Sequence, residues 1–182
     1  MHKINSKTNK YINRYNLKIV TFSEIDLRNT YAQYRPEYNE EDLHMITSPH
    51  YELANLFYTK GEKWLRKKFH KTRYAMLKKN ISGEIGSISK KKVLLFYSIR
   101  KGYLRGPHKN NYIVVLNKPL IVTRYGMKPV LSKSPEIFMG HHRVGALLAL
   151  GINSAKVIVA EDNNPGSCQC YGSLHDKYKT IN

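Results

Sequence analysis

One segment, residues 136–162, constrains the fold more than any other part of this chain. It starts with a short apolar run that ends at Gly140, continues with apolar residues at helical spacing up to Gly151, and finishes with Val157-Ile158-Val159. The spacing predicts a short helix with an apolar face and a glycine stop, and the β-branched run predicts a buried strand. We therefore expect the order strand, tight glycine turn, helix, strand.

The turn and the first turn of this helix carry Gly140, His141, His142 and Arg143. Unpaired backbone amides and the helix dipole favour an anion at this end of a helix. Arginine and histidine add donors suited to phosphate, and glycine lets a phosphate approach the backbone. These four residues are therefore the candidate phosphate-binding site. The alternative is a glycine turn with solvent-exposed His and Arg side chains.

Chemistry on a phosphate would also need a general acid or base. His141 or His142 can act as one near neutral pH, and because adjacent side chains point in different directions, at most one of them faces the ligand. Glu136, a few residues before the turn, is the candidate carboxylate, and Glu161 and Asp162 lie just past the last strand, where ligands often gather in open α/β sheets. The alternative is that each carboxylate is an ordinary surface acid.

The chain is strongly basic, with 31 Lys and Arg against 13 Asp and Glu, a net charge of +18 over 182 residues. A field of this size attracts DNA, RNA, nucleotides or anionic membrane surfaces. The 41% of apolar residues is enough to bury a core and argues against wholesale disorder. Because lysine abundance alone is weak evidence, the position of the charges matters more than their number.

Residues 49–79 are predicted to form one or two helices, with Gly61 as a candidate break. Ser48 can cap the first amides, Pro49 suits the first helical position and Glu52 favours the positive end of the dipole. The face opposite the apolar one carries nine cations: Lys60, Lys63, Arg66, Lys67, Lys68, Lys71, Arg73, Lys78 and Lys79.

Cations three and four residues apart on a helix project together and can release counterions cooperatively from a nucleic-acid backbone. Lys63, Arg66, Lys67 and Lys71 are therefore the candidate nucleic-acid-binding residues. The alternative is a solvated helix face without a partner.

The fold class expected is α+β, a small mixed sheet with helices. Residues 1–16 are basic with few large aliphatic side chains and predict a flexible basic arm. Residues 17–89 are predicted as an N-terminal helical region with a candidate strand at 17–22, an acidic loop at 31–42 and a linker at 81–89. Residues 90–182 form the second unit, with a polar C-terminal tail. In it, residues 93–99 fit a helix or a strand, and residues 112–116 and 120–123 are strand-like.

From about residue 90 to 162 the sequence resembles the ParB/sulfiredoxin-like superfamily, whose hallmark is a G-x-[HR]-R box followed by an Ala/Leu helix with a Leu-Gly end. The box here is Gly140-His141-His142-Arg143, followed by Ala146-Leu147-Leu148-Ala149-Leu150-Gly151. The stretch Tyr97–Gly102 is similar to the S-I-x-x-G stretch that precedes the first strand in these domains. Members bind nucleotide phosphates at the helix after the box, so the resemblance implies phosphate binding by the box residues and a nucleotide, ATP or CTP with Mg²⁺, as ligand.

We therefore expect a ParB-like protein that binds nucleotide or nucleic-acid phosphates and acts in phosphate chemistry on nucleic acid. Two alternatives stay open: an ATP-dependent kinase of the free-amino-acid type, and a non-catalytic DNA- or RNA-binding module. His141 stands where sulfiredoxins carry their reactive cysteine, so thiol chemistry is not expected. Met139 stands where kinase-like members tend to carry an acid, which disfavours the kinase.

The remaining expectations concern location and metal. No apolar run approaches the roughly 18–20 residues of a membrane span, and the start of the chain lacks a secretory signal, so we expect a cytoplasmic protein with no membrane partner. Cys168, Cys170 and His175 offer three candidate ligands, whereas a structural zinc site needs four. They are interpreted as reduced thiols and an imidazole in a polar tail, and no metal site is assigned.

Overall fold

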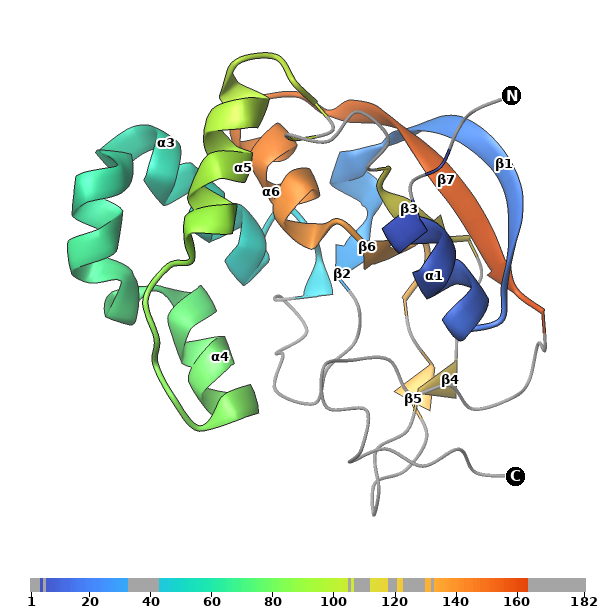
Figure 1. Ribbon diagram of the computed structural model, residues 1–182, viewed down its shortest axis with the longest axis horizontal. Coiled ribbons are helices and arrows are strands. Elements are labelled where there is room, and N and C mark those ends of the chain that lie inside the picture. The colour runs from blue at the N-terminus through green and yellow to red at the C-terminus, as the bar shows by residue number, and fades with distance from the viewer. Residues whose placement is uncertain are drawn as a thin grey trace.

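The computed structural model describes residue 4 and residues 6–32, 43–104, 106, 112–117, 121–122, 130–131 and 133–163. Its centre is a five-stranded mixed sheet in the order β1-β7-β3-β6-β2 (Figure 1). The strands are β1 Leu17–Asp26, β2 Tyr31–Ala32, β3 Val114–Leu116, β6 Glu136–Met139 and β7 Ser154–Asp162. β7 is antiparallel to β1 and parallel to β3, and β6 is antiparallel to β3 and parallel to β2.

Two short strands, β4 Ile121–Val122 and β5 Val130–Leu131, form a separate antiparallel pair. The helices are α1 Ser6–Arg14, α3 Pro49–Lys68, α4 Arg73–Ser82, α5 Lys90–Arg100 and α6 His141–Ala149, with 3-10 turns η1 Leu27–Asn29 and η2 Phe69–Lys71. The α+β class with a mixed sheet is confirmed.

Alternate side chains of the central strands point to two separate cores, as the period of two in a β-strand requires. Val115, Ile137, Val157 and Val159 face the larger core, which α3, α4, α5 and α6 complete. Val114, Phe138 and Ile158 face the smaller core, which includes Ile12 of α1. Figure 1 shows the four later helices on one side of the sheet and α1 on the other.

The expectation of a flexible arm at residues 1–16 is wrong for Ser6–Arg14, which form α1. Thr8 and Ile12 lie four residues apart and so share one helix face, and Tyr15 follows the end of the helix. Thr8 and Ile12 are buried, and the Tyr15 ring meets Phe138 edge-on at 5.2 Å. The few apolar side chains of this segment are enough to hold the helix in place, because they pack against apolar side chains of the sheet.

The boundary expected between residues 17–89 and 90–182 does not separate two folding units. β1 pairs with β7 along its length, from Leu17 opposite Asp162 to Asp26 opposite Ser154. β2 likewise pairs with β6. Since strands from both segments complete one sheet, the helical region and the segment with the glycine turn form a single structure.

The predicted helix start at Ser48 is confirmed: the Ser48 hydroxyl accepts a hydrogen bond from the Tyr51 amide, Pro49 opens α3 and Glu52 lies in its first turn. The predicted break is also confirmed, since Gly61 has φ 84° and interrupts the helical backbone. Residues 93–99 are helical, within α5. The acidic loop at 31–42 lies outside the described residues except for β2.

Within the part of the chain that the structure describes, no helix is both long enough and apolar enough to cross a membrane.

Candidate functional site

The glycine turn between β6 and α6 is formed as the sequence predicts. Gly140 has φ 105°, a left-handed conformation, and its carbonyl accepts hydrogen bonds from the Arg143 and Val144 amides at 2.7 and 3.0 Å. A Cβ at this position would lie 3.2 Å from Cγ1 of Ile113, which is close, and the backbone conformation itself disfavours any other residue. The Arg143 and Val144 amides are therefore engaged within the turn, and the positive end of the α6 dipole favours an anion here.

The three residues that follow Gly140 point in different directions. His141 is half-buried and lines a cavity. His142 packs edge-on against the rings of His50 and Tyr74, with centroid distances of 4.7 and 5.0 Å. Arg143 is only 6% exposed, and its guanidinium carbon lies 3.6 Å from the place of a Cβ on Gly140. Of the predicted phosphate-binding side chains, the structure brings His141 alone to the cavity wall.

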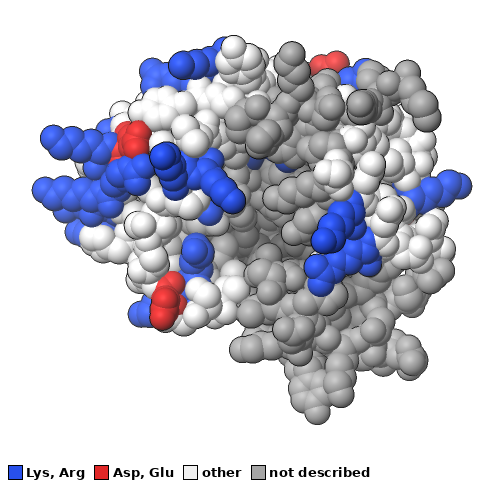
Figure 2. All heavy atoms as spheres, in the orientation of Figure 1, with Lys and Arg blue, Asp and Glu red and all other residues white. Residues whose placement is uncertain are grey.

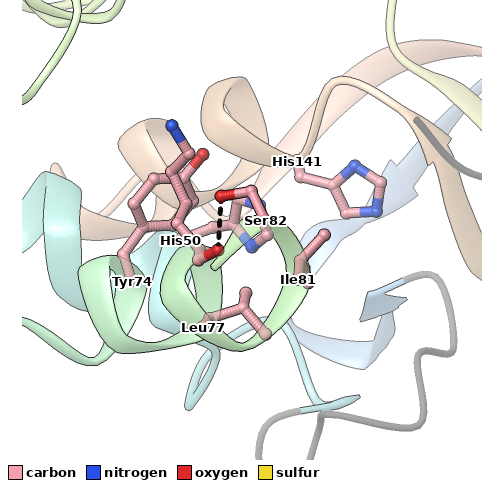
Figure 3. A pocket seen from close by; sticks show the side chains of 7 residues that line it. His50, Tyr74, Leu77, Ile81, Ser82 and His141 are labelled. Carbon is pink, nitrogen blue, oxygen red and sulfur yellow. Dashed lines mark hydrogen bonds between the residues drawn. The ribbon is translucent and has the colours of Figure 1, made fainter. Parts of the chain in front are cut away.

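The cavity has a volume of about 180 Å³ and lies where α3, α4 and α6 meet. Figure 3 shows that its side chains come from helices far apart in the sequence. Its described lining consists of His50, Tyr74, Leu77, Lys78, Ile81, Ser82 and His141. Histidine, lysine and serine supply polar groups, and Leu77 and Ile81 supply an apolar floor. The arrangement suits a small anion with an apolar part attached.

His50 is a site residue that the sequence analysis missed. It lies in the first turn of α3, is 8% exposed, and its ring lies 5.1 Å from the ring of His141. Gly145 allows this approach, because a Cβ there would lie 2.7 Å from the carbonyl carbon and oxygen of His50. Because a glycine inside a helix costs about 1 kcal/mol relative to alanine, Gly145 within the predicted helix was the sequence signal of a close helix contact.

The charges around the cavity are positive. Burial lowers the pKa of His142 well below its ordinary value, and Lys92, His141, Arg143 and Lys78 lower it further. Burial also lowers the pKa of Lys92, with a contribution from Lys78. Burial brings the pKa of Arg143 to about 10. His142 is therefore neutral at pH 7, and the Lys and Arg side chains around it give a positive potential that favours an anion.

His142, whose Nε2 atom is shielded from solvent, gives the protein a pH-dependent stability. Its pKa is depressed in the folded state, so the unfolded chain binds the proton first when the pH falls below about 6.5, and stability is lost there. We expect the free energy of unfolding to fall by up to about 1.4 kcal/mol per pH unit from this group. Urea denaturation between pH 7.5 and 5 measures it.

The matched variants for this measurement are His142→Gln, which removes the half-buried imidazole, and His70→Gln, which removes an exposed one. The first should lose this part of the pH dependence and the second should keep it. Equal pH dependence in both variants would contradict the assignment.

The candidate carboxylates lie away from the cavity. Glu136 is 1% exposed and starts β6 opposite Tyr31 and Leu116, whereas Gly140 follows the other end of that strand. At about 3.3 Å per residue, the length of β6 separates the two. Glu161 pairs with Lys18 and Asp162 with Leu17, at the end of β7. None of these carboxylates is among the residues that line the cavity.

The four candidate nucleic-acid-binding residues are all exposed. Lys63, Arg66 and Lys67 lie on the C-terminal half of α3, and Lys71 lies in η2. Arg66 forms an ion pair with Glu62 at 2.7 Å. Figure 2 shows Lys and Arg side chains gathered over the side of the molecule where Figure 1 places α3, α4 and α5. We call Lys63, Arg66, Lys67 and Lys71 the basic surface.

Among the described residues, no group of three or more His, Cys, Asp or Glu side chains is arranged to hold a metal ion. Cys168, Cys170 and His175 lie outside the described residues.

No protein-family model, curated protein or solved structure matches this chain.

Proposed function

We propose that this protein binds phosphate groups of nucleotides or nucleic acids in the cavity between α3, α4 and α6. The observation that carries the proposal is the positive lining of that cavity: Lys78 and His141 face it, and every neighbouring charge that shifts the pKa of His142 is positive. The positive end of the α6 dipole lies beside His141 and also favours an anion. A phosphate is the common biological anion that such donors suit.

The resemblance to the ParB/sulfiredoxin-like superfamily supports the same proposal. In that superfamily the box and the helix after it hold nucleotide phosphates, and here the box residue His141 lines the cavity. We therefore propose a ParB-like protein. Its proposed location is the cytoplasm, where nucleotides and nucleic acids are found.

The size of the cavity bears on which phosphate compound enters. Sites for whole drug-sized ligands have volumes of about 300–1,000 Å³. A cavity of about 180 Å³ suits a phosphate with part of a sugar rather than a complete nucleoside triphosphate. Together with the basic surface, this favours nucleic acid over free ATP or CTP with Mg²⁺ as the partner.

Lys78 is the residue whose replacement tests the site. We expect Lys78→Gln to weaken binding of a nucleoside monophosphate about ten- to a hundredfold, because it removes a charge-assisted hydrogen bond of roughly 1.5–3 kcal/mol. Isothermal titration calorimetry with adenosine and cytidine monophosphate measures this change.

The matched control is Lys79→Gln, since Lys79 is the next residue on α4, is exposed and does not line the cavity. It should leave the affinity within about twofold, as screening by solvent makes a distant surface charge weak. If both variants bind like the unmodified protein, the phosphate does not enter this cavity.

A further inference from the structure

We propose that this cavity cleaves single-stranded RNA by acid–base chemistry, with His50 and His141 as the two catalytic imidazoles and Lys78 as the stabilising cation. The inference rests on the phosphate binding proposed above and adds a reaction and a substrate class to it.

The first support is the pairing of the two imidazoles. His50 comes from the first turn of α3 and His141 from the first turn of α6, and both line the same cavity. Their ring centroids are 5.1 Å apart and their planes differ by 30°. Since a hydrogen bond spans about 2.7–3.2 Å, both rings can reach oxygen atoms around one phosphorus atom.

The second support is the way in which His50 is held. The ring of His142 contacts it edge-on at 4.7 Å and the ring of Tyr74 at 5.2 Å. The backbone of His50 packs against Gly145. His142 and Tyr74 are therefore positioning residues that fix the imidazole relative to His141, and fixed geometry is a large part of what an active site contributes to rate.

The third support is the composition of the cavity. Its described lining contains no carboxylate, so the imidazoles are the lining groups suited to exchange protons near neutral pH. The Ser82 hydroxyl is engaged in a hydrogen bond to the Lys78 carbonyl at 2.8 Å, drawn as a dashed line in Figure 3. This points to a nucleophile that comes with the substrate, and the ribose 2′-hydroxyl of RNA is one.

The reaction balances without a further reactant. One imidazole accepts the proton of the 2′-hydroxyl while O2′ forms a bond to phosphorus. The bond between phosphorus and O5′ breaks, and the other imidazole, in its protonated form, donates a proton to O5′. The products are a 2′,3′-cyclic phosphate and a 5′-hydroxyl end. Lys78 and the positive end of the α6 dipole stabilise the charge that develops on the phosphate oxygens.

The basic surface explains how a strand reaches the cavity. Lys71 in η2 lies two residues before α4, which forms one wall of the cavity, so a backbone held along α3 and η2 continues toward that wall. A single strand fits better than a duplex, since its backbone can bend to place the 2′-oxygen in line with the leaving O5′.

The test uses the full chain, an end-labelled single-stranded RNA and excess EDTA. We expect cleavage with 2′,3′-cyclic phosphate ends and a bell-shaped dependence of rate on pH. The same oligonucleotide with 2′-O-methyl groups should bind and stay intact. His141→Gln, at a half-buried position, should slow cleavage at least about a hundredfold while RNA binding persists. His50→Gln should do the same, with folding checked by circular dichroism.

His70→Gln is the matched control, because His70 is exposed and lies outside the cavity. The variant is purified in the same way as His141→Gln. It should retain full cleavage. Because a contaminating nuclease would cleave RNA in both preparations, loss of cleavage in His141→Gln but not in His70→Gln assigns the activity to this protein. RNA that binds in a Lys78-dependent manner but stays intact would overturn the cleavage and leave the proposed phosphate site standing. Cleavage that His141→Gln does not slow would overturn the assignment of the imidazoles. Absence of any phosphate or RNA binding would overturn both proposals.

Discussion

Replacing Gly145 by alanine is expected to destabilise the protein by about 3 kcal/mol or more. The new Cβ would lie 2.7 Å from the carbonyl carbon and oxygen of His50 and 2.9 Å from the Tyr51 amide nitrogen. These atoms are backbone, so no side chain can rotate away and α3 must move from α6. Overpacking in a close-packed interior costs about 1–3 kcal/mol, and more where backbone must shift. Urea denaturation at pH 7.5 measures the loss.

Gly86→Ala is the matched control for this substitution. Nothing lies within 4 Å of a Cβ at Gly86, and its φ is not positive. We expect a change below about 1 kcal/mol, on the stabilising side, because alanine restricts the unfolded chain. A Gly145→Ala protein as stable as Gly86→Ala would show that α3 and α6 are not packed as described. The cavity between them would then lose its structural basis.

Replacing the basic surface, Lys63, Arg66, Lys67 and Lys71, together by glutamine is expected to weaken duplex DNA binding more than about a thousandfold at 0.1 M salt. Each phosphate contact contributes about 0.9 to the slope of log affinity against log salt, so four lost contacts flatten it by up to about 3.6. All four side chains are exposed, so the substitution leaves the core intact. Fluorescence anisotropy over a salt series gives both values.

A second quadruple variant separates a dedicated surface from a chain that is merely rich in lysine. Lys10, Arg14, Lys18 and Lys156 are also exposed and lie on α1, β1 and β7, across the sheet from α3 or at its edge. Their replacement by glutamine removes the same charge as replacement of the basic surface. It should leave most of the slope of log affinity against log salt unchanged. If both sets flatten the slope equally, the basic surface has no special role and the phosphate cavity stands alone.

Local signals were sufficient for the elements that carry the site. The strand, glycine turn, helix and strand over residues 136–162 follow from apolar spacing and from the left-handed turn at Gly140. The start of α3 at Ser48 and Pro49 and its break at Gly61 follow from capping and backbone chemistry. Such signals act within a few residues and do not depend on the rest of the fold.

The arrangement of the cavity depends on contacts that local patterns cannot show. His141 and Arg143 are two residues apart on a helix and therefore about 200° apart around its axis, so only one of them can face α4. Which one does so is set by where α3 and α4 pack. His50 reaches the cavity only because Gly145 admits its backbone, a contact across most of the chain. The same holds for β1, whose partner β7 lies at the other end of the described chain.

The α1 segment shows that amino-acid composition alone can also miss an ordered helix. Its few apolar residues indicated an arm without structure, because an isolated segment of this kind cannot offset the entropy of ordering. The face of the sheet that α1 covers offsets this entropy, since Ile12 is buried in one cluster with Val114, Phe138 and Ile158. The order of a segment that covers an apolar face formed elsewhere in the chain is therefore underestimated when only the segment's own sequence is considered.

We expect a phosphate to bind at the start of α6, between His141 and Lys78. A titration of ¹⁵N-labelled protein with adenosine monophosphate, followed by amide chemical shifts, tests it most directly. The predicted result is that the largest shifts occur at the His141 and His142 amides and along the wall of α4 from Lys78 to Ser82. Largest shifts on the far face of the sheet, or no shifts at millimolar ligand, would contradict it.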